Sequence, residues 1–77
     1  MKATTLYARD GWTLTSYGSG WAYRLEFSRA DGSRSSAWFQ DDDAEAFCAN
    51  TIGEDGFFVD HVEERFADYA EVMETAT

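Results

Sequence analysis

Alternation of apolar and polar residues marks the first half of the chain as β-sheet. The pattern is clearest in WAYRLEFS (21–28), whose first, third, fifth and seventh residues are large and apolar. This period of two is typical of an antiparallel strand with one buried face. Three further β-prone segments, 2–8, 12–17 and 34–40, accompany it.

Short glycine-containing turns separate these segments. Asp10-Gly11 and Asp31-Gly32 are hairpin signals, and GSG (18–20) supplies the remaining turn. Such short connections favour pairing between consecutive strands. The sequence therefore predicts an antiparallel β-meander of three to four strands.

After Gln40 the spacing of apolar residues becomes helical. A first helix is predicted over 41–53, opened by an Asp run suited to an N-terminus and closed by Gly53 in the C′ position. Its apolar face consists of Ala44, Phe47, Cys48, Thr51 and Ile52. A loop, 54–56, leads to a second helix over about 57–73.

The second predicted helix also has one apolar arc. The residues of that arc are Phe58, Val59, Val62, Phe66, Tyr69, Ala70 and Met73. Such a stripe must cover another apolar surface, and the Tyr23, Leu25 and Phe27 side of the sheet offers one. The expected fold is α+β, with both helices packed on one face of the sheet.

The 77 residues are expected to form a single domain, with the sheet in 1–40 and acidic helices in 41–77. The single cysteine allows no intrachain disulfide, and no signal peptide or apolar run of roughly 20 residues is evident. A cytoplasmic location, in a bacterial host cell, is the expectation. The thirteen aromatic residues are interpreted as core packing for a domain with little interior.

Charge is distributed unevenly along the chain. Residues 1–39 carry five basic and three acidic side chains, whereas residues 40–77 carry twelve acidic side chains and only Arg65 as a base. The net charge of −9 therefore comes entirely from the second half. Asymmetry of this kind indicates a partner rather than a fold.

The acidic side chains of the second half are the candidate partner-binding residues. They are Asp41, Asp42, Asp43, Glu45, Glu54, Asp55, Asp60, Glu63, Glu64, Asp68, Glu71 and Glu74. On the second helix, Asp60, Glu63, Glu64, Asp68, Glu71 and Glu74 would oppose the apolar arc, and the two helices with their loop would form one continuous negative surface.

A solvated helix face is the simple explanation of this surface. Two features count against it. Ordinary solvent faces mix charges and gain from Glu–Lys pairs, whereas Asp60, Glu64 and Asp68 are like-charged neighbours that repel. The same sign also continues through the first helix and the loop. Carboxylates about 5–6 Å apart on a rigid frame approximate a DNA strand, with its charge every 3.4 Å or so.

In size, acidity and layout, the chain resembles small phage-encoded inhibitors of host defence. Anti-CRISPR proteins that imitate DNA are the most similar class, followed by anti-restriction DNA mimics. The resemblance covers the whole chain as a short sheet with carboxylate-lined helices, without a shared motif. It implies that the target is the basic DNA-binding groove of a bacterial effector complex. A type I, Cascade-like complex is preferred over a single-protein nuclease.

The remaining residues form no recognisable catalytic or metal-binding pattern. His61 is the only histidine and has no second ligand or nucleophile beside it in sequence, and Cys48 lies in an apolar arc without basic neighbours. Counted from Asp41 or Asp43, the calcium-loop spacing fails. The prediction is a non-enzymatic protein without cofactor or metal. Its acidity disfavours direct nucleic-acid binding.

Two alternatives remain open. The chain can instead be a small acidic interaction module, such as an antitoxin-like protein, that binds a basic partner unrelated to DNA. An enzyme is the third and weakest hypothesis.

A monomer is expected, with a dimer through Trp12 or Trp38 as the alternative. Competition with DNA for the partner separates a mimic from an interaction module.

Overall fold

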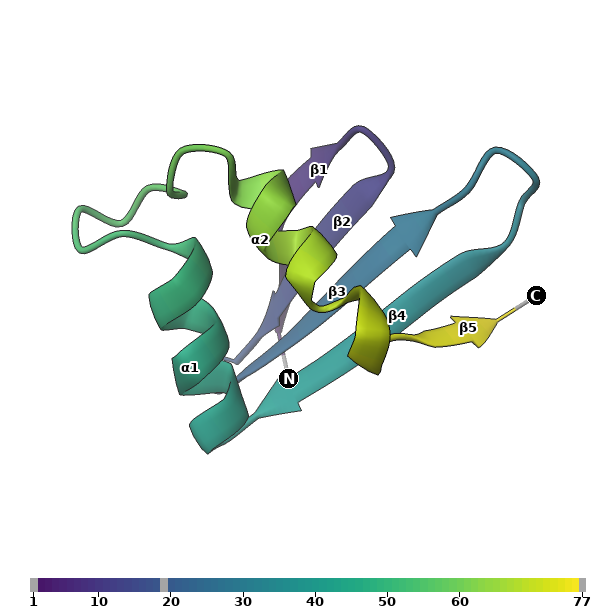
Figure 1. The fold of residues 1–77 in the computed structure, drawn as a ribbon. Helices are drawn as coiled ribbons and strands as arrows, with labels where there is room; N and C mark the ends of the chain where they lie inside the picture. The colour runs from purple at the N-terminus through teal and green to yellow at the C-terminus, as the bar shows by residue number, and fades with distance from the viewer. Residues whose placement is uncertain (1, 19, 77) are drawn as a thin grey trace.

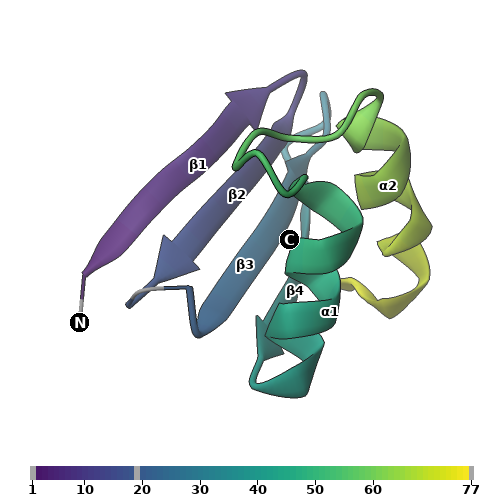
Figure 2. The same cartoon turned by 90° about the vertical axis from the view of Figure 1, so that its left-hand side faces the viewer.

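The protein consists of one antiparallel sheet with its helices on one side. The computed structural model describes residues 2–18 and 20–76, and for 74–76 it describes the backbone alone. The sheet has five strands in the order β1-β2-β3-β4-β5. Helices α1 and α2 cover the same face of this sheet (Figure 1, Figure 2). The predicted α+β meander with helices on one face is therefore confirmed.

The four long strands agree with the alternation pattern to within a residue or two. They are β1 (Ala3–Arg9), β2 (Trp12–Tyr17), β3 (Ala22–Ser28) and β4 (Arg34–Gln40). Each pairs antiparallel with the next. The predicted glycine turns join them: Gly11 and Gly32 have φ of 88° and 91°, a backbone region that residues with a Cβ rarely adopt.

Helix α1 is Asp42–Thr51, one or two residues shorter at each end than predicted. Asp41 precedes it with φ 55°, and its side chain makes no capping hydrogen bond. At the other end the chain turns extended at Ile52, with φ −120°. Gly53 follows the C-cap residue Ile52 and so occupies the predicted C′ position, although its φ is not positive.

The prediction of a helix over about 57–73 is wrong in its extent. Helix α2 covers only Val62–Asp68, after His61 in the left-handed conformation with φ 58°. A single 3₁₀ turn, η1 (Ala70–Val72), follows. The chain then becomes strand β5 (Glu74–Ala76), which pairs antiparallel with β4 and was not predicted.

Residues 52–59 fold back as a small hairpin in place of the expected helical start. Ile52 forms an isolated antiparallel bridge with Phe58. The amide of Gly53 donates a hydrogen bond of 2.7 Å to the carbonyl of Phe57, and the amide of Val59 donates one of 3.0 Å to Thr51. In this segment, these backbone amides and carbonyls pair with each other across the hairpin, so they do not need helical hydrogen bonds.

The core lies between the sheet and the two helices. Its fully or largely buried apolar residues are Leu14, Tyr23, Leu25, Ala37, Phe39, Ala44, Phe47, Val62 and Phe66. Phe39 and Phe47 stack with their ring centroids 4.5 Å apart, so β4 and α1 are joined by aromatic contact. Tyr7, Trp12, Phe58 and Tyr69 pack around this centre. The interpretation of the aromatics as packing thus holds for most of them.

Two tryptophans differ from their expected positions. Trp12 packs against Phe27 and Phe66, at centroid distances of 4.6 and 5.5 Å, so it contributes to the core. Trp21 lies in the turn before β3, half exposed, although the alternation placed it with the core residues of that strand.

No helix among the described residues is long and apolar enough to cross a membrane.

Candidate functional site

The first group of candidate carboxylates surrounds the beginning of α1. Asp41, Asp42, Asp43 and Glu45 are all exposed. Acidic residues in the first turn complement the free amides and the positive end of the helix dipole, which explains why the sequence begins a helix there. The four side chains do not share one side of the helix, as the two hollows next to them show.

Asp41, Asp42 and Glu45 border a hollow of about 650 Å³ whose other wall includes Trp21 and Tyr23. Asp43 instead lines a separate hollow of about 300 Å³ beside Phe39, Tyr69 and Val72. The beginning of α1 therefore presents negative charge in two directions.

The second group lies in the loop that follows α1. Glu54 and Asp55 are exposed. The Asp55 carboxylate accepts a hydrogen bond of 3.0 Å from the Phe57 amide and so holds the turn at Gly56. A ten-residue helix is about 15 Å long. The loop therefore lies roughly that far from the first group, at the opposite end of α1.

The third group is carried by α2 and the residue pair before it. Asp60, Glu64 and Asp68 line one hollow of about 330 Å³, together with His61 and Arg65. Here the predicted spacing is confirmed, because Glu64 and Asp68 are neighbours on consecutive helical turns. Asp60 precedes the helix but reaches the same surface.

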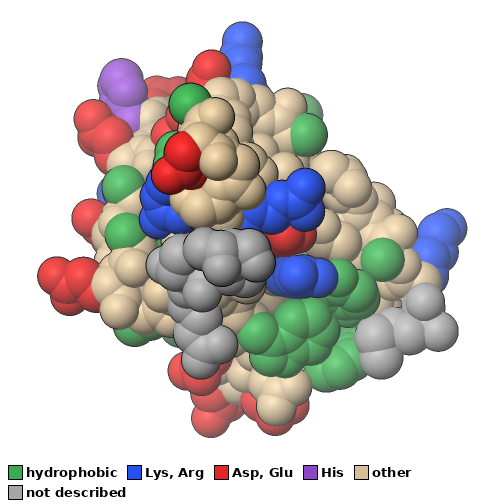
Figure 3. Space-filling view, turned by 90° about the vertical axis from the view of Figure 1, so that its right-hand side faces the viewer, with side chains coloured by type: hydrophobic (Ala, Val, Ile, Leu, Met, Phe, Trp, Pro, Cys, Tyr) green, Lys and Arg blue, Asp and Glu red, His purple; other side chains and the backbone are tan. Residues whose placement is uncertain are grey.

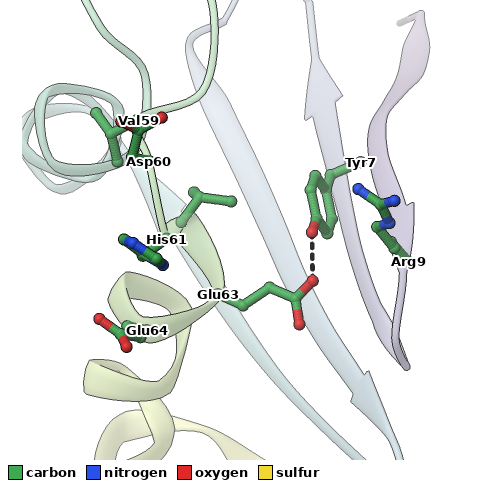
Figure 4. Close-up of a pocket in the computed structure, with 8 residues that line it drawn as sticks. Tyr7, Arg9, Val59, Asp60, His61, Glu63 and Glu64 are labelled. Carbon is green, nitrogen blue, oxygen red and sulfur yellow. Dashed lines mark hydrogen bonds between the residues drawn. The ribbon is translucent and has the colours of Figure 1, made fainter.

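Glu63 does not belong to this outward surface. Its carboxylate accepts a hydrogen bond from the hydroxyl of Tyr7 on β1. Figure 4 shows Glu63 directed toward Tyr7, whereas His61 and Glu64 point away from it. The hydrogen bond raises the pKa of Tyr7, with desolvation and the negative charge of Glu63 acting in the same direction. The placement of Glu63 opposite the apolar arc is therefore wrong: it ties α2 to the edge of the sheet.

The last two candidates lie outside α2. Glu71 is exposed in the 3₁₀ turn η1. Glu74 is in β5, where its backbone pairs with Ser36 of β4, and its side chain lies outside the described part of the chain. The helix was expected to carry both residues, but it ends at Asp68, and the chain then passes through η1 into β5.

The outward carboxylates are free of basic partners. Among the described residues, the only ion pair is between Arg24 and Glu26 on β3, at 3.6 Å. None of the described candidate carboxylates comes within ion-pair distance of a cation, Arg65 included. Their side chains therefore make no charge-neutralising contact within the described part of the chain.

Two further titratable side chains, those of His61 and Cys48, lie in the helical half. His61 is exposed at the start of α2, and Cys48 is half-buried beside Tyr23, whose pKa is raised to about 12 by burial and then by contact with Cys48. The Tyr23 hydroxyl therefore stays protonated at neutral pH, as expected of a tyrosine with a structural role. In the described part of the chain, no group of three His, Cys, Asp or Glu side chains could hold a metal ion.

One surface feature was only partly anticipated from the sequence. Tyr17, Trp21, Trp38 and Val72 gather on the far side of the sheet and its β4 edge, and we call them the tryptophan patch. The Trp38 ring lies 5.0 Å from Tyr17 and 6.3 Å from Trp21 between centroids. The sequence RSSAWFQ (34–40) indicated this exposure, because Trp38 alternates in step with the polar residues Arg34, Ser36 and Gln40.

Comparison of the chain with protein-family models, with curated proteins and with solved structures finds no match.

Proposed function

We propose that this protein is a non-enzymatic inhibitor that presents carboxylates in place of nucleic-acid phosphates. Its target would be the basic DNA-binding groove of a bacterial defence complex, and a type I, Cascade-like CRISPR effector is the preferred candidate. The observation that carries the proposal is the exposed, unpaired acidity of the helical half.

Nine exposed candidate carboxylates support this proposal most directly. They are Asp41, Asp42, Asp43, Glu45, Glu54, Asp55, Asp60, Glu64 and Asp68. They lie on both helices and the loop between them, and none of them has an ion-pair partner among the described residues. A groove lined with Lys and Arg would attract such a surface through the same long-range steering that it uses for DNA.

Packed aromatic rings support the frame beneath the charges. Phe47 and Phe66 are fully buried, and their rings lie parallel, 6.3 Å apart between centroids. Both helices are therefore fixed to each other and to the sheet. Preorganised charges bind more tightly than flexible ones, because less side-chain and loop freedom is lost on binding.

A competition assay tests the proposal. Labelled double-stranded DNA is bound to a purified type I effector complex, and the protein is titrated in. A mimic must displace the DNA, and its own affinity must fall steeply from low to moderate salt. Binding without displacement would support an acidic interaction module or antitoxin-like protein instead.

A matched pair of variants locates the contact. The site variant combines Asp60→Asn, Glu64→Gln and Asp68→Asn. The control combines Asp10→Asn, Glu26→Gln and Asp31→Asn, which remove the same charge from the sheet half. We expect the site variant to bind at least about tenfold more weakly and the control to bind nearly as wild type. Equal losses would mean that only net charge matters, and the proposed surface would be wrong.

A further inference from the structure

The open face of the sheet carries an exposed aromatic cluster that the proposed function does not use. Cross-strand neighbours share a face, and Trp38 stands opposite Arg24, which stands opposite Thr15. Trp38 is 47% exposed and Trp21 is 43% exposed. Figure 3, viewed from the side opposite to Figure 2, shows a hydrophobic patch beside Lys and Arg side chains. Large rings left in water forgo the hydrophobic gain of burial.

The patch has both a half-exposed ring, that of Trp38, and a recess beside it. A hollow of about 300 Å³ adjoins Trp38 and is lined by Arg24, Ser36, Ala37, Trp38 and Val72. An isologous contact between two identical surfaces needs this kind of self-complementarity, since each copy contributes the same knob and the same hole. In a two-fold pairing, the Trp38 ring of one copy enters the hollow of the other, within reach of its Arg24. A guanidinium next to an indole face adds cation–π attraction.

Charge selects a second copy as the occupant. Two copies with a net charge of −9 each repel through their helical sides. On the open face of the sheet, Arg24 and Arg34 accompany one carboxylate among the described side chains, that of Glu26, which pairs with Arg24 of the same copy. Asp43 shares a separate hollow with Trp38 and Val72. A two-fold axis through this face sets arginines of one copy against the Glu26 of the other. Two arginines are few for holding a polyanion against the repulsion of the remaining charge.

We infer that the protein forms a homodimer through the tryptophan patch, with the two sheets face to face. Stacked sheets pack about 10 Å apart, a spacing that the interlocked tryptophans fill. Both acidic helical surfaces then point outward on opposite sides of the dimer. The inference stands independently of the proposed function, since no partner of other chemistry takes part in it.

Sedimentation velocity from low micromolar to several hundred micromolar protein tests the inference. The wild type should pass from monomer to dimer mass, and Trp38→Glu should weaken association at least about tenfold. Phe57→Glu is the matched control: Phe57 is 74% exposed in the loop after α1, and the substitution adds the same charge. This control should dimerise as wild type. Trp38→Thr, a polar residue suited to a strand surface, repeats the test if the Glu variant does not fold.

Salt supplies a second readout. Screening reduces the repulsion between two acidic copies, so the dimer should strengthen with added salt, opposite to the behaviour expected for a basic partner. A wild type that remains monomeric over the whole range overturns the inference. Equal loss of association in the Trp38 and Phe57 variants also overturns it, as does quenching of tryptophan fluorescence by single-stranded DNA in the wild type but not in Trp38→Thr.

Discussion

The two faces of the sheet use the same kind of side chain for different purposes. On the helix-covered face, Phe39, Phe47 and Phe66 are buried and in ring contact with one another or with their neighbours. On the open face, Tyr17 and Trp38 form an equally close ring pair that remains half exposed. Aromatic content alone therefore does not distinguish a core from a surface. What distinguishes them is whether another layer of the chain covers the rings.

Removing a ring from each face should give the largest contrast in stability. Phe66 is fully buried and contacts four other rings, those of Tyr7, Trp12, Phe47 and Phe58. Phe66→Ala should lower the free energy of unfolding by about 3–5 kcal/mol, through lost burial and a residual cavity. In a domain of this size, that loss can unfold the chain.

Trp38→Ala is the matched change on the open face. It should cost far less, roughly 1 kcal/mol in dilute solution, because half of the ring is already in water. Urea unfolding followed by circular dichroism measures both variants at one protein concentration. Similar losses in the two would show that the open face is as important to the fold as the covered one.

The boundary between helix and sheet can be tested at Tyr7. Tyr7→Phe removes the hydroxyl that donates to Glu63 while keeping the ring contacts with Phe58 and Phe66. We expect a loss of about 1 kcal/mol at neutral pH, since the bond is charge-assisted but partly in water. If Tyr7→Phe unfolds at the same urea concentration as the wild type, this hydrogen bond does not stabilise the fold.

The same pair predicts a pH dependence. The pKa of Tyr7 is raised above its ordinary value of 10.0 mainly by the hydrogen bond to Glu63. The folded state therefore holds the proton to a higher pH than the unfolded chain does. The stabilisation is complete below pH 10 and is lost as the pH rises through the folded pKa.

Burial raises the pKa of Tyr23 in the same direction, so the wild type should lose stability at alkaline pH for both reasons. Tyr7→Phe should show a shallower loss, measured by urea unfolding at several pH values from neutral upward. If the free energy of unfolding falls equally steeply with pH in the two proteins, the Tyr7–Glu63 hydrogen bond does not contribute to the alkaline loss of stability.

The smallest effect on stability is expected where the charges point outward. Reversing Asp60, Glu64, Asp68 and Glu71 to Lys changes exposed side chains without ion-pair partners in the described structure. Like-charge repulsion between helical neighbours is worth only a few tenths of a kcal/mol per pair, so the melting temperature should stay nearly constant. A thermal melt followed by circular dichroism measures this. A large destabilisation would mean that these carboxylates support the fold rather than a partner.

The four long strands of the sheet could be predicted from the sequence because their signals are local. Alternation in 21–28 reports which side chains face inward, and glycines such as Gly11 and Gly32 mark the turns between neighbours. Strand order in a meander then follows from short connections. The charge asymmetry, and with it most of the candidate surface, was also readable, because exposed carboxylates need no tertiary contact to be placed outside.

The path of the last twenty residues was decided only by tertiary structure. The apolar residues predicted to face the core do so in the main, since Phe58, Val62, Phe66, Tyr69 and Met73 all contact it. They reach it in succession from a loop, from helix α2, from the turn residue between α2 and η1, and from the extended residue after η1. Periodicity identifies which side chains are buried, but it does not fix the backbone when hydrogen bonds are available elsewhere in the chain.

Tertiary structure also decided which polar and aromatic side chains remain free. Glu63 and Glu64 are adjacent in sequence and equally acidic, yet Glu63 binds Tyr7 and Glu64 faces solvent, because only Glu63 lies over the edge strand. Trp12 and Trp38 likewise occupy opposite faces of one sheet, and only Trp12 has α2 above it. Side-chain chemistry determines what a residue can do, and the covering layer determines whether it is available to do it.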